Sequence, residues 1–249
     1  MSSRLASFRG PSTPTSSPAF HKQPNSPSSP SRLSESTYHR KTRTLLQELR
    51  SVTETWDDLV LIDGLKAARQ LVDTRTDLDN ALKLIPDKRP RTHLVGPKLK
   101  IMDECIAKLD IVLSKLQKQF QRMNNIIDNL ELVLIDAHKV KGWQWVQETP
   151  LWVTWPLEAF GKFVRPASRI KCSFTLTSVT RVPEILKPYH RSLALHIQLV
   201  DALRKHSIPF EKSREIINKW VEQPWLESAG WDAVWEDICE AEVERWGNA

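Results

Sequence analysis

The side chains that could catalyse a reaction or hold a metal ion do not fall at productive spacings in this sequence. Among the seven histidines, His190 and His196 are six residues apart and would not share one face of a helix. Asp57 and Asp58 are adjacent, and neighbouring side chains of a helix diverge, which is typical of a charged surface. The motifs of nucleotide-binding loops, serine hydrolases, zinc proteases and calcium-binding loops are missing. We therefore expect a protein that is not an enzyme and that needs no cofactor and no metal.

Hydroxyl groups that precede proline are the residues here with a defined chemistry, the acceptance of a phosphoryl group. Proline-directed kinases need the fixed backbone of proline after the acceptor, and cyclin-dependent kinases also favour a basic residue two positions beyond that proline. The candidate phosphorylation sites are Thr13, Ser17, Ser26 and Ser29. Only Ser29 has the basic residue, Arg32, in the favoured place. The alternative is that such pairs are simply frequent in any segment rich in serine and proline.

These acceptors lie in a basic N-terminal tail. Residues 1–38 are dominated by serine, proline and threonine, and they cannot bury enough apolar area to offset the entropy of ordering, so we expect disorder. Residues 1–44 hold seven lysines and arginines against one acid, Glu35, which leaves 29 bases and 29 acids in the rest of the chain. The pI of 9.3 therefore results from the basic residues of the tail. The composition does not favour sequence-specific nucleic-acid binding by the folded part.

Cysteine content and hydropathy place the chain in a reducing, aqueous compartment. The three cysteines, Cys105, Cys172 and Cys239, are odd in number and far apart, so neither a disulfide framework nor a metal site is indicated. No apolar run approaches the length of a membrane span, and the N-terminus has no secretory signal. We expect the cytosol or the nucleus.

Two long helices dominate the central part of the sequence. The first, at about 39–85, has apolar residues three and four apart, and its pattern blurs at Asp63 and Gly64, where we expect a bend or loosened packing. Residues 86–97 contain three prolines and a glycine and are predicted to form a loop. The second helix, at about 98–138, keeps an unbroken four-three alternation, which is typical of a coiled-coil seam. The seam consists of Met102, Ile106, Leu109, Leu113, Leu116, Phe120, Met123, Ile127, Leu130 and Leu134.

The sequence thus predicts an all-α protein with an antiparallel coiled-coil hairpin at 39–140. A narrow seam leaves room for a partner helix, and the alternative is that it forms only intramolecular core. Residues 141–249 are predicted to form a small helical unit rich in tryptophan. It begins with a loop or extended segment at 143–160, followed by helices at about 183–206, 211–222 and 228–246, the last of them acidic.

Two aromatic motifs in the C-terminal part resemble a known family. The first motif is Pro150-Leu151-Trp152-Val153-Thr154-Trp155-Pro156, followed by Phe160. The second is Trp220-Val221-Glu222-Gln223-Pro224-Trp225-Leu226-Glu227. Both are similar to the cyclin-dependent kinase 2-interacting protein family, whose animal members have a Thr-Trp-Pro, a helix and then a Trp-x-x-Gln-Pro-aromatic-x-Glu. The resemblance covers about residues 50–227, as in a divergent, fungal-type member, and the acidic segment after it has no counterpart.

The resemblance implies a small nuclear adaptor without activity of its own. Its partners would be a cyclin-dependent kinase, replication-licensing and checkpoint proteins, and a complex built around AAA-type ATPases that serves replisome turnover and ribosome maturation. The motif residues Trp152, Trp155, Pro156, Trp220, Pro224 and Trp225 would then bind partners or pack the C-terminal unit. Packing is the ordinary role of such large aromatic side chains, while one or two at a rim would be binding hot spots.

Residues 161–181 interrupt the family pattern between Phe160 and the following helix. They contain five bases and no acid, and Gly161-Lys162 can be encoded by a splice-donor sequence. Excision up to Arg181 would keep the reading frame and join Phe160 to a valine. We hypothesise a retained short intron, and the alternative is a genuine basic insertion loop. Transcript reads that cross this stretch without a junction would refute the hypothesis.

Two other functions remain open. One is a structural coiled-coil subunit of a cytoskeletal, kinetochore or tethering complex. The other is non-specific binding of nucleic acid or anionic membrane by the basic tail, which would fall steeply with salt and vanish when residues 1–44 are deleted. The identity of the partners recovered in a pull-down separates the adaptor from the structural subunit.

Replacement of Thr13, Ser17, Ser26 and Ser29 by alanine should abolish phosphate incorporation by a cyclin-dependent kinase, because each substitution removes the acceptor hydroxyl. Labelling of the full-length protein in vitro measures this directly. Unchanged labelling would exclude the tail as the regulated segment.

Overall fold

The computed structural model describes residues 36–85, 92–149, 157, 182–227 and 235. Within these ranges the regular elements are helices and no β-strand occurs, so the predicted all-α class is confirmed. The four phosphorylation candidates lie outside the described residues, as do the insertion at 161–181 and the motif residues Trp152, Trp155 and Pro156. Of the predicted acidic helix only Trp235 is described, and its side chain is buried.

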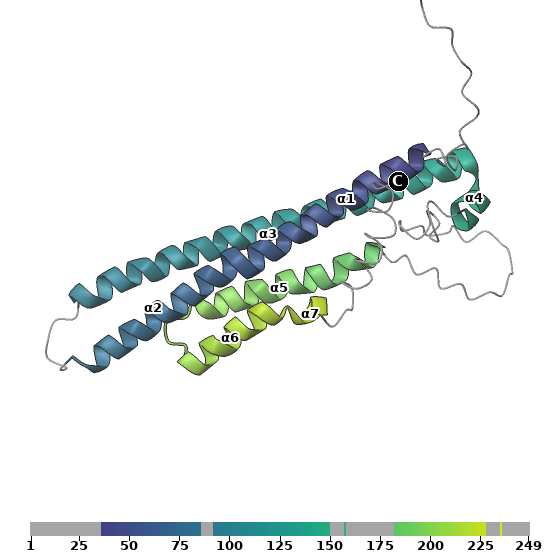
Figure 1. Ribbon diagram of the computed structural model, residues 1–249. Helices are drawn as coiled ribbons and strands as arrows, with labels where there is room; N and C mark the ends of the chain where they lie inside the picture. Colours follow the sequence, from purple (N-terminus) through teal and green to yellow (C-terminus); the bar gives the residue numbers. More distant parts are fainter. Residues whose placement is uncertain (1–35, 86–91, 150–156, 158–181, 228–234, 236–249) are drawn as a thin grey trace, which may run out of the picture. The chain divides into compact units, whose positions relative to one another are not determined.

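A long antiparallel hairpin forms the framework (Figure 1). Its first arm is continuous and consists of α1 (Thr37–Asp57), the π-helical segment η1 (Asp58–Gly64) and α2 (Leu65–Lys83). The second arm, α3 (Thr92–Lys141), returns along both α1 and α2. The first arm begins where Ser36 and His39 form a capping box, in which each side chain bonds the backbone N–H of the other. The predicted hairpin is confirmed.

The predicted loop at 86–97 is wrong for its last six residues, which are helical. Pro97 is only the sixth residue of α3, so it removes a single hydrogen bond near an end where the first N–H groups have no intrahelical acceptor. Gly96 is exposed, and nothing lies within 4 Å of the position that a Cβ would take there. Proline and glycine are typical of loops, but both are tolerated near this end of a helix.

The prediction of a loop or extended segment from residue 143 is also wrong at its start. Residues Trp143–Glu148 form the short helix α4, separated from α3 by Gly142, whose φ of 85° only glycine adopts readily. Trp143 meets the edge of His138 at 5.3 Å, and Trp145 lies 5.8 Å from Tyr38, both between ring centroids. The aromatic residues therefore fold a helical turn back onto the end of the hairpin.

The C-terminal unit packs along the hairpin. It contains the 3-10 turn η3 (Val182–Ile185), α5 (Leu186–Leu203), α6 (Phe210–Glu222) and α7 (Pro224–Glu227). Helix α5 contacts α3, while α6 contacts α2 and η1 (Figure 1). Arg204 at the end of α5 forms an ion pair with Asp110 of α3. The core therefore runs through the hairpin and the C-terminal unit together.

Gly64 marks a close approach between helices, so loosened packing, one of the two alternatives that we expect at this position, is wrong. A Cβ at residue 64 would lie 2.5 Å from Cζ2 of Trp220, closer than such atoms can approach. The Trp220 indole N–H donates to the carbonyl of Val60 within η1, at 2.9 Å. A π-helical turn inserts one extra residue and shifts the apolar pattern along the helix, which explains why the periodicity blurs here.

The Gly64→Ala variant should lose about 1–3 kcal/mol of unfolding free energy, because the new methyl group must displace the Trp220 ring or one of its helices. Urea denaturation of the full-length protein measures the change.

Gly96→Ala is the matched control, since the same methyl group there enters open space. Its stability should stay unchanged or rise by up to about 1 kcal/mol through helix propensity. Equal effects of the two substitutions would contradict the proposed steric conflict.

Candidate interaction surface

The ten seam residues of α3 lie in the hydrophobic core of the chain itself. Seven of them are buried, and Ile106, Leu113 and Phe120 are half-buried against that core. Five further residues of α3 are buried: Cys105, Val112, Ile126, Val133 and Ala137. This wider apolar stripe accommodates α5 in addition to α1 and α2, and Phe120 contacts His190 of α5 at 5.5 Å between ring centroids. The seam is therefore occupied within the chain.

The second aromatic motif fastens the C-terminal unit to the first arm. Trp220 is fully buried, and its ring meets His196 edge-on at 4.6 Å between centroids. Gln223 ends α6 in the left-handed conformation, with φ of 40°, and its side-chain Oε1 accepts a hydrogen bond from the Trp56 indole at 3.3 Å. Pro224 then begins α7, because its missing N–H costs nothing at a helix start. The motif thus turns the chain and ties it to α1.

Trp225 differs from the other tryptophans of this motif. Its side chain is 42% exposed, and the Arg191 guanidinium lies 5.2 Å from the ring centroid. This is cation–π geometry at a partly solvated position. Among the described motif residues, Trp225 has the exposure expected of a rim hot spot, whereas Trp220 is structural.

Arg75 and His196 are buried ionisable residues that the sequence reasoning missed. Arg75 is 4% exposed and donates to the Leu203 carbonyl at the end of α5 and to the Ser213 hydroxyl of α6, at 2.7 and 3.4 Å. The negative end of the α5 dipole favours its charge. Burial lowers the pKa of Arg75 below its ordinary value, and the charge of Asp79 acts in the opposite direction. Arg75 lies four residues after Leu71 and three residues before Leu78, which places it on the apolar stripe of its helix. This spacing is the feature of the sequence that indicates its burial.

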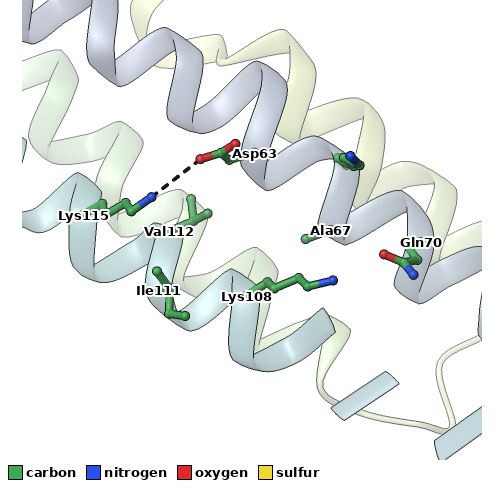
Figure 2. Close-up of a pocket in the computed structure, with 8 residues that line it drawn as sticks. Asp63, Ala67, Gln70, Lys108, Ile111, Val112 and Lys115 are labelled. Carbon is green, nitrogen blue, oxygen red and sulfur yellow. Dashed lines mark ion pairs between the residues drawn. The ribbon is translucent and has the colours of Figure 1, made fainter. Parts of the chain in front are cut away.

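Two separate hollows lie between the two arms along the solvent-facing side of the hairpin, and we call this pair the hairpin groove. Its deeper part, near the middle of the first arm, has a volume of about 290 Å³ and is lined by Asp63, Lys66, Ala67, Gln70, Lys108, Ile111, Val112 and Lys115 (Figure 2). Its wider part lies towards the start of α1, with a volume of about 740 Å³. Arg40, Lys41, Thr44, Leu45, Asn129, Leu132, Val133 and Asp136 line it.

One face of α3 contributes to both parts of the groove. Lys108, Lys115, Arg122, Asn129 and Asp136 recur every seven residues, which places them along nearly the same side of the helix. Three of them form ion pairs across to the first arm. These pairs are Lys115 with Asp63 at 3.7 Å, Arg122 with Glu48 at 3.4 Å and Asp136 with Lys41 at 3.9 Å. They are exposed and contribute little stability, so they fix the edges of the groove more than the fold.

The groove combines apolar and basic side chains. Leu132 is 62% exposed and Ile111 is 55% exposed, although both are large aliphatic residues. Figure 2 shows Lys108 extending from α3 towards Ala67 and Gln70 of α2, while Lys115 reaches Asp63. The two parts of the groove are lined by five bases and two acids, a net charge of +3. Positively charged and apolar side chains therefore lie side by side along this surface.

Within the described ranges no helix is both long and apolar enough to cross a bilayer. In the same residues, no three side chains of the types that bind metals come together. Comparison with protein-family models and with curated proteins gives no match to this chain.

The free energy of unfolding should fall as the pH is lowered below about 6.5, in part through His196. This ring is fully buried, and burial lowers its pKa below the ordinary value of 6.5, although the hydrogen bond with the Ser192 carbonyl opposes the shift. The unfolded chain therefore takes up the proton first, so this contribution is complete above pH 6.5 and is lost below it.

Urea denaturation at pH 7.5 and at pH 5.5 tests this, with the His196→Gln and His206→Gln variants compared. The first variant should be less stable at pH 7.5 and should lose less stability on acidification than the wild type. The second, at an exposed position, should keep the wild-type difference. An unchanged difference in the His196→Gln protein would contradict the assignment.

Proposed function

We propose that this protein is a non-catalytic adaptor of a nuclear complex that binds a partner protein through the hairpin groove. One observation carries the proposal. Leu132 and Ile111 are mostly exposed beside the groove, although the chain has ample core in which to bury aliphatic side chains. Exposed aliphatic side chains that line a groove between two helices are a common way to receive a third helix.

The resemblance to the cyclin-dependent kinase 2-interacting protein family extends the proposal. It suggests an adaptor in DNA replication, checkpoint signalling or an AAA-type ATPase complex of ribosome maturation, in contact with a cyclin-dependent kinase. The second motif supports this resemblance, because Trp220 and Gln223 each form a hydrogen bond with a residue of the first arm. A motif with such specific partners is one that a family would retain with its fold.

A structural subunit of a cytoskeletal, kinetochore or tethering complex is the second candidate. The length of α3 favours it, because 50 residues at about 1.5 Å each span roughly 75 Å. Such a helix can separate two binding partners. Affinity purification of the tagged full-length protein, followed by mass spectrometry, distinguishes the candidates. Replication factors or ATPases support the adaptor, whereas tubulin, kinetochore or vesicle proteins support the structural subunit.

The Leu132→Glu variant should reduce recovery of the adaptor's partners by about tenfold or more, because it places a charge where an apolar contact is expected. Quantitative mass spectrometry of the purified complexes measures the recovery, and circular dichroism checks that the helix content is unchanged.

Leu84→Glu provides the control with the same chemical change. Leu84 is 85% exposed at the end of α2 and does not line the groove. The Leu84→Glu protein should recover the same partners as the wild type, in the same amounts. Equal recovery with both variants would reject the hairpin groove as the binding surface.

A further inference from the structure

We propose that the hairpin groove binds an acidic amphipathic helix of the partner protein. This inference rests on the proposed adaptor function and adds the chemical class of the bound segment. The charged side chains that line the groove favour such a segment. Asp63 and Asp136 are the two acids of the lining, and each already pairs with a base, Lys115 and Lys41 respectively.

The remaining bases of the lining carry the excess positive charge. In the hollow near the middle of the first arm, Lys66 comes from α2 and Lys108 from α3, so both walls contribute, while Arg40 of α1 lines the other hollow. All three side chains are exposed, so a carboxylate of the partner can pair with them without any rearrangement of the core. Basic side chains on both walls attract a segment with acids on both of its flanks, and they repel a basic one.

The floor of the groove selects an apolar stripe between those flanks. Ala67 and Val112 are buried at its base, while Ile111 stands exposed at its edge. In the wider part, Val133 is buried and Leu132 exposed in the same arrangement. An incoming aliphatic side chain would therefore cover the exposed Ile111 and Leu132, which is the favourable contribution of apolar burial.

The spacing along α3 fits a helix as the bound segment. Lys108, Lys115 and Arg122 recur every seven residues, or about 10.5 Å along the axis. A helix laid beside α3 with a seven-residue repeat presents one side chain of its own at each of these steps. A second copy of the chain fits less well, because a two-fold interface would set this net-positive surface against itself.

A synthetic helix tests the chemistry directly. The probe is a fluorescently labelled peptide of about three heptads, with leucine at the two seam positions and glutamate on both flanks. Its counterpart carries lysine in place of each glutamate. Fluorescence anisotropy with the full-length protein should show binding of the acidic peptide about tenfold or more tighter than that of the basic one, and this preference should shrink with added salt.

A pair of double variants locates the binding site. K66E/K108E reverses two charges of the groove and should weaken binding of the acidic peptide by about tenfold. K205E/K219E makes the same change in net charge at exposed positions of the α5–α6 region and should leave binding within about twofold of the wild type. Equal affinity for the two peptides, or an equal loss in the two variants, would overturn the proposal.

Two further results separate this inference from the adaptor function. If Leu132→Glu removes partners from the purified complex while K66E/K108E retains them, the groove binds a partner whose helix is not acidic, and only the present inference fails. If neither variant alters the complex, both proposals fail. Sedimentation that reveals a wild-type dimer, dissociated by K66E/K108E, would assign the groove to a second copy and would also overturn the inference.

Discussion

The contact between Trp220 and the first arm of the hairpin sets the position of the C-terminal unit. The indole lies where residue 64 has no side chain, and its N–H bonds a carbonyl of the π-helical segment. Once α6 is held in this way, Gln223 at its end reaches Trp56, and His196 of α5 meets the Trp220 ring. A larger residue at position 64 would disturb all of these contacts together, because interiors packed at crystal density yield little.

Arg75 provides a second connection between the same parts, and it has consequences for binding. Its guanidinium joins α2 to the end of α5 and to Ser213 of α6, so the C-terminal unit is tied to the first arm at two levels. With α5 held along α3, the wide apolar stripe of α3 is used within the chain. Among the described residues, the side of the hairpin with the ion-paired edges and the exposed Leu132 is then left open to a partner.

Much of this fold was predictable because long amphipathic helices have apolar residues that recur three and four positions apart. The two arms and the seam of α3 followed from four-three spacing alone. The predictions for residues 92–97 and 143–148 are wrong because the average preferences of proline and tryptophan do not hold at a helix end, where Pro97 and the tryptophans near Gly142 lie. The π-helical turn is visible in the sequence only as a break in period, and Trp220, whose indole bonds a carbonyl within it, lies 160 residues away from that carbonyl in the chain.

The candidate surface was harder to predict than the fold, because it depends on how charges are distributed in space. Outside the tail, bases and acids are equal in number, and that total gives no reason to expect a basic surface. Folding nevertheless places Lys66 of α2 and Lys108 of α3 on opposite walls of one hollow, while Asp63, the acid of that lining, forms an ion pair with Lys115. The attraction felt by a partner at a distance of a Debye length, about 8–10 Å, comes from this local excess and not from the total. A chain that is neutral by composition can therefore still select an acidic partner at one face.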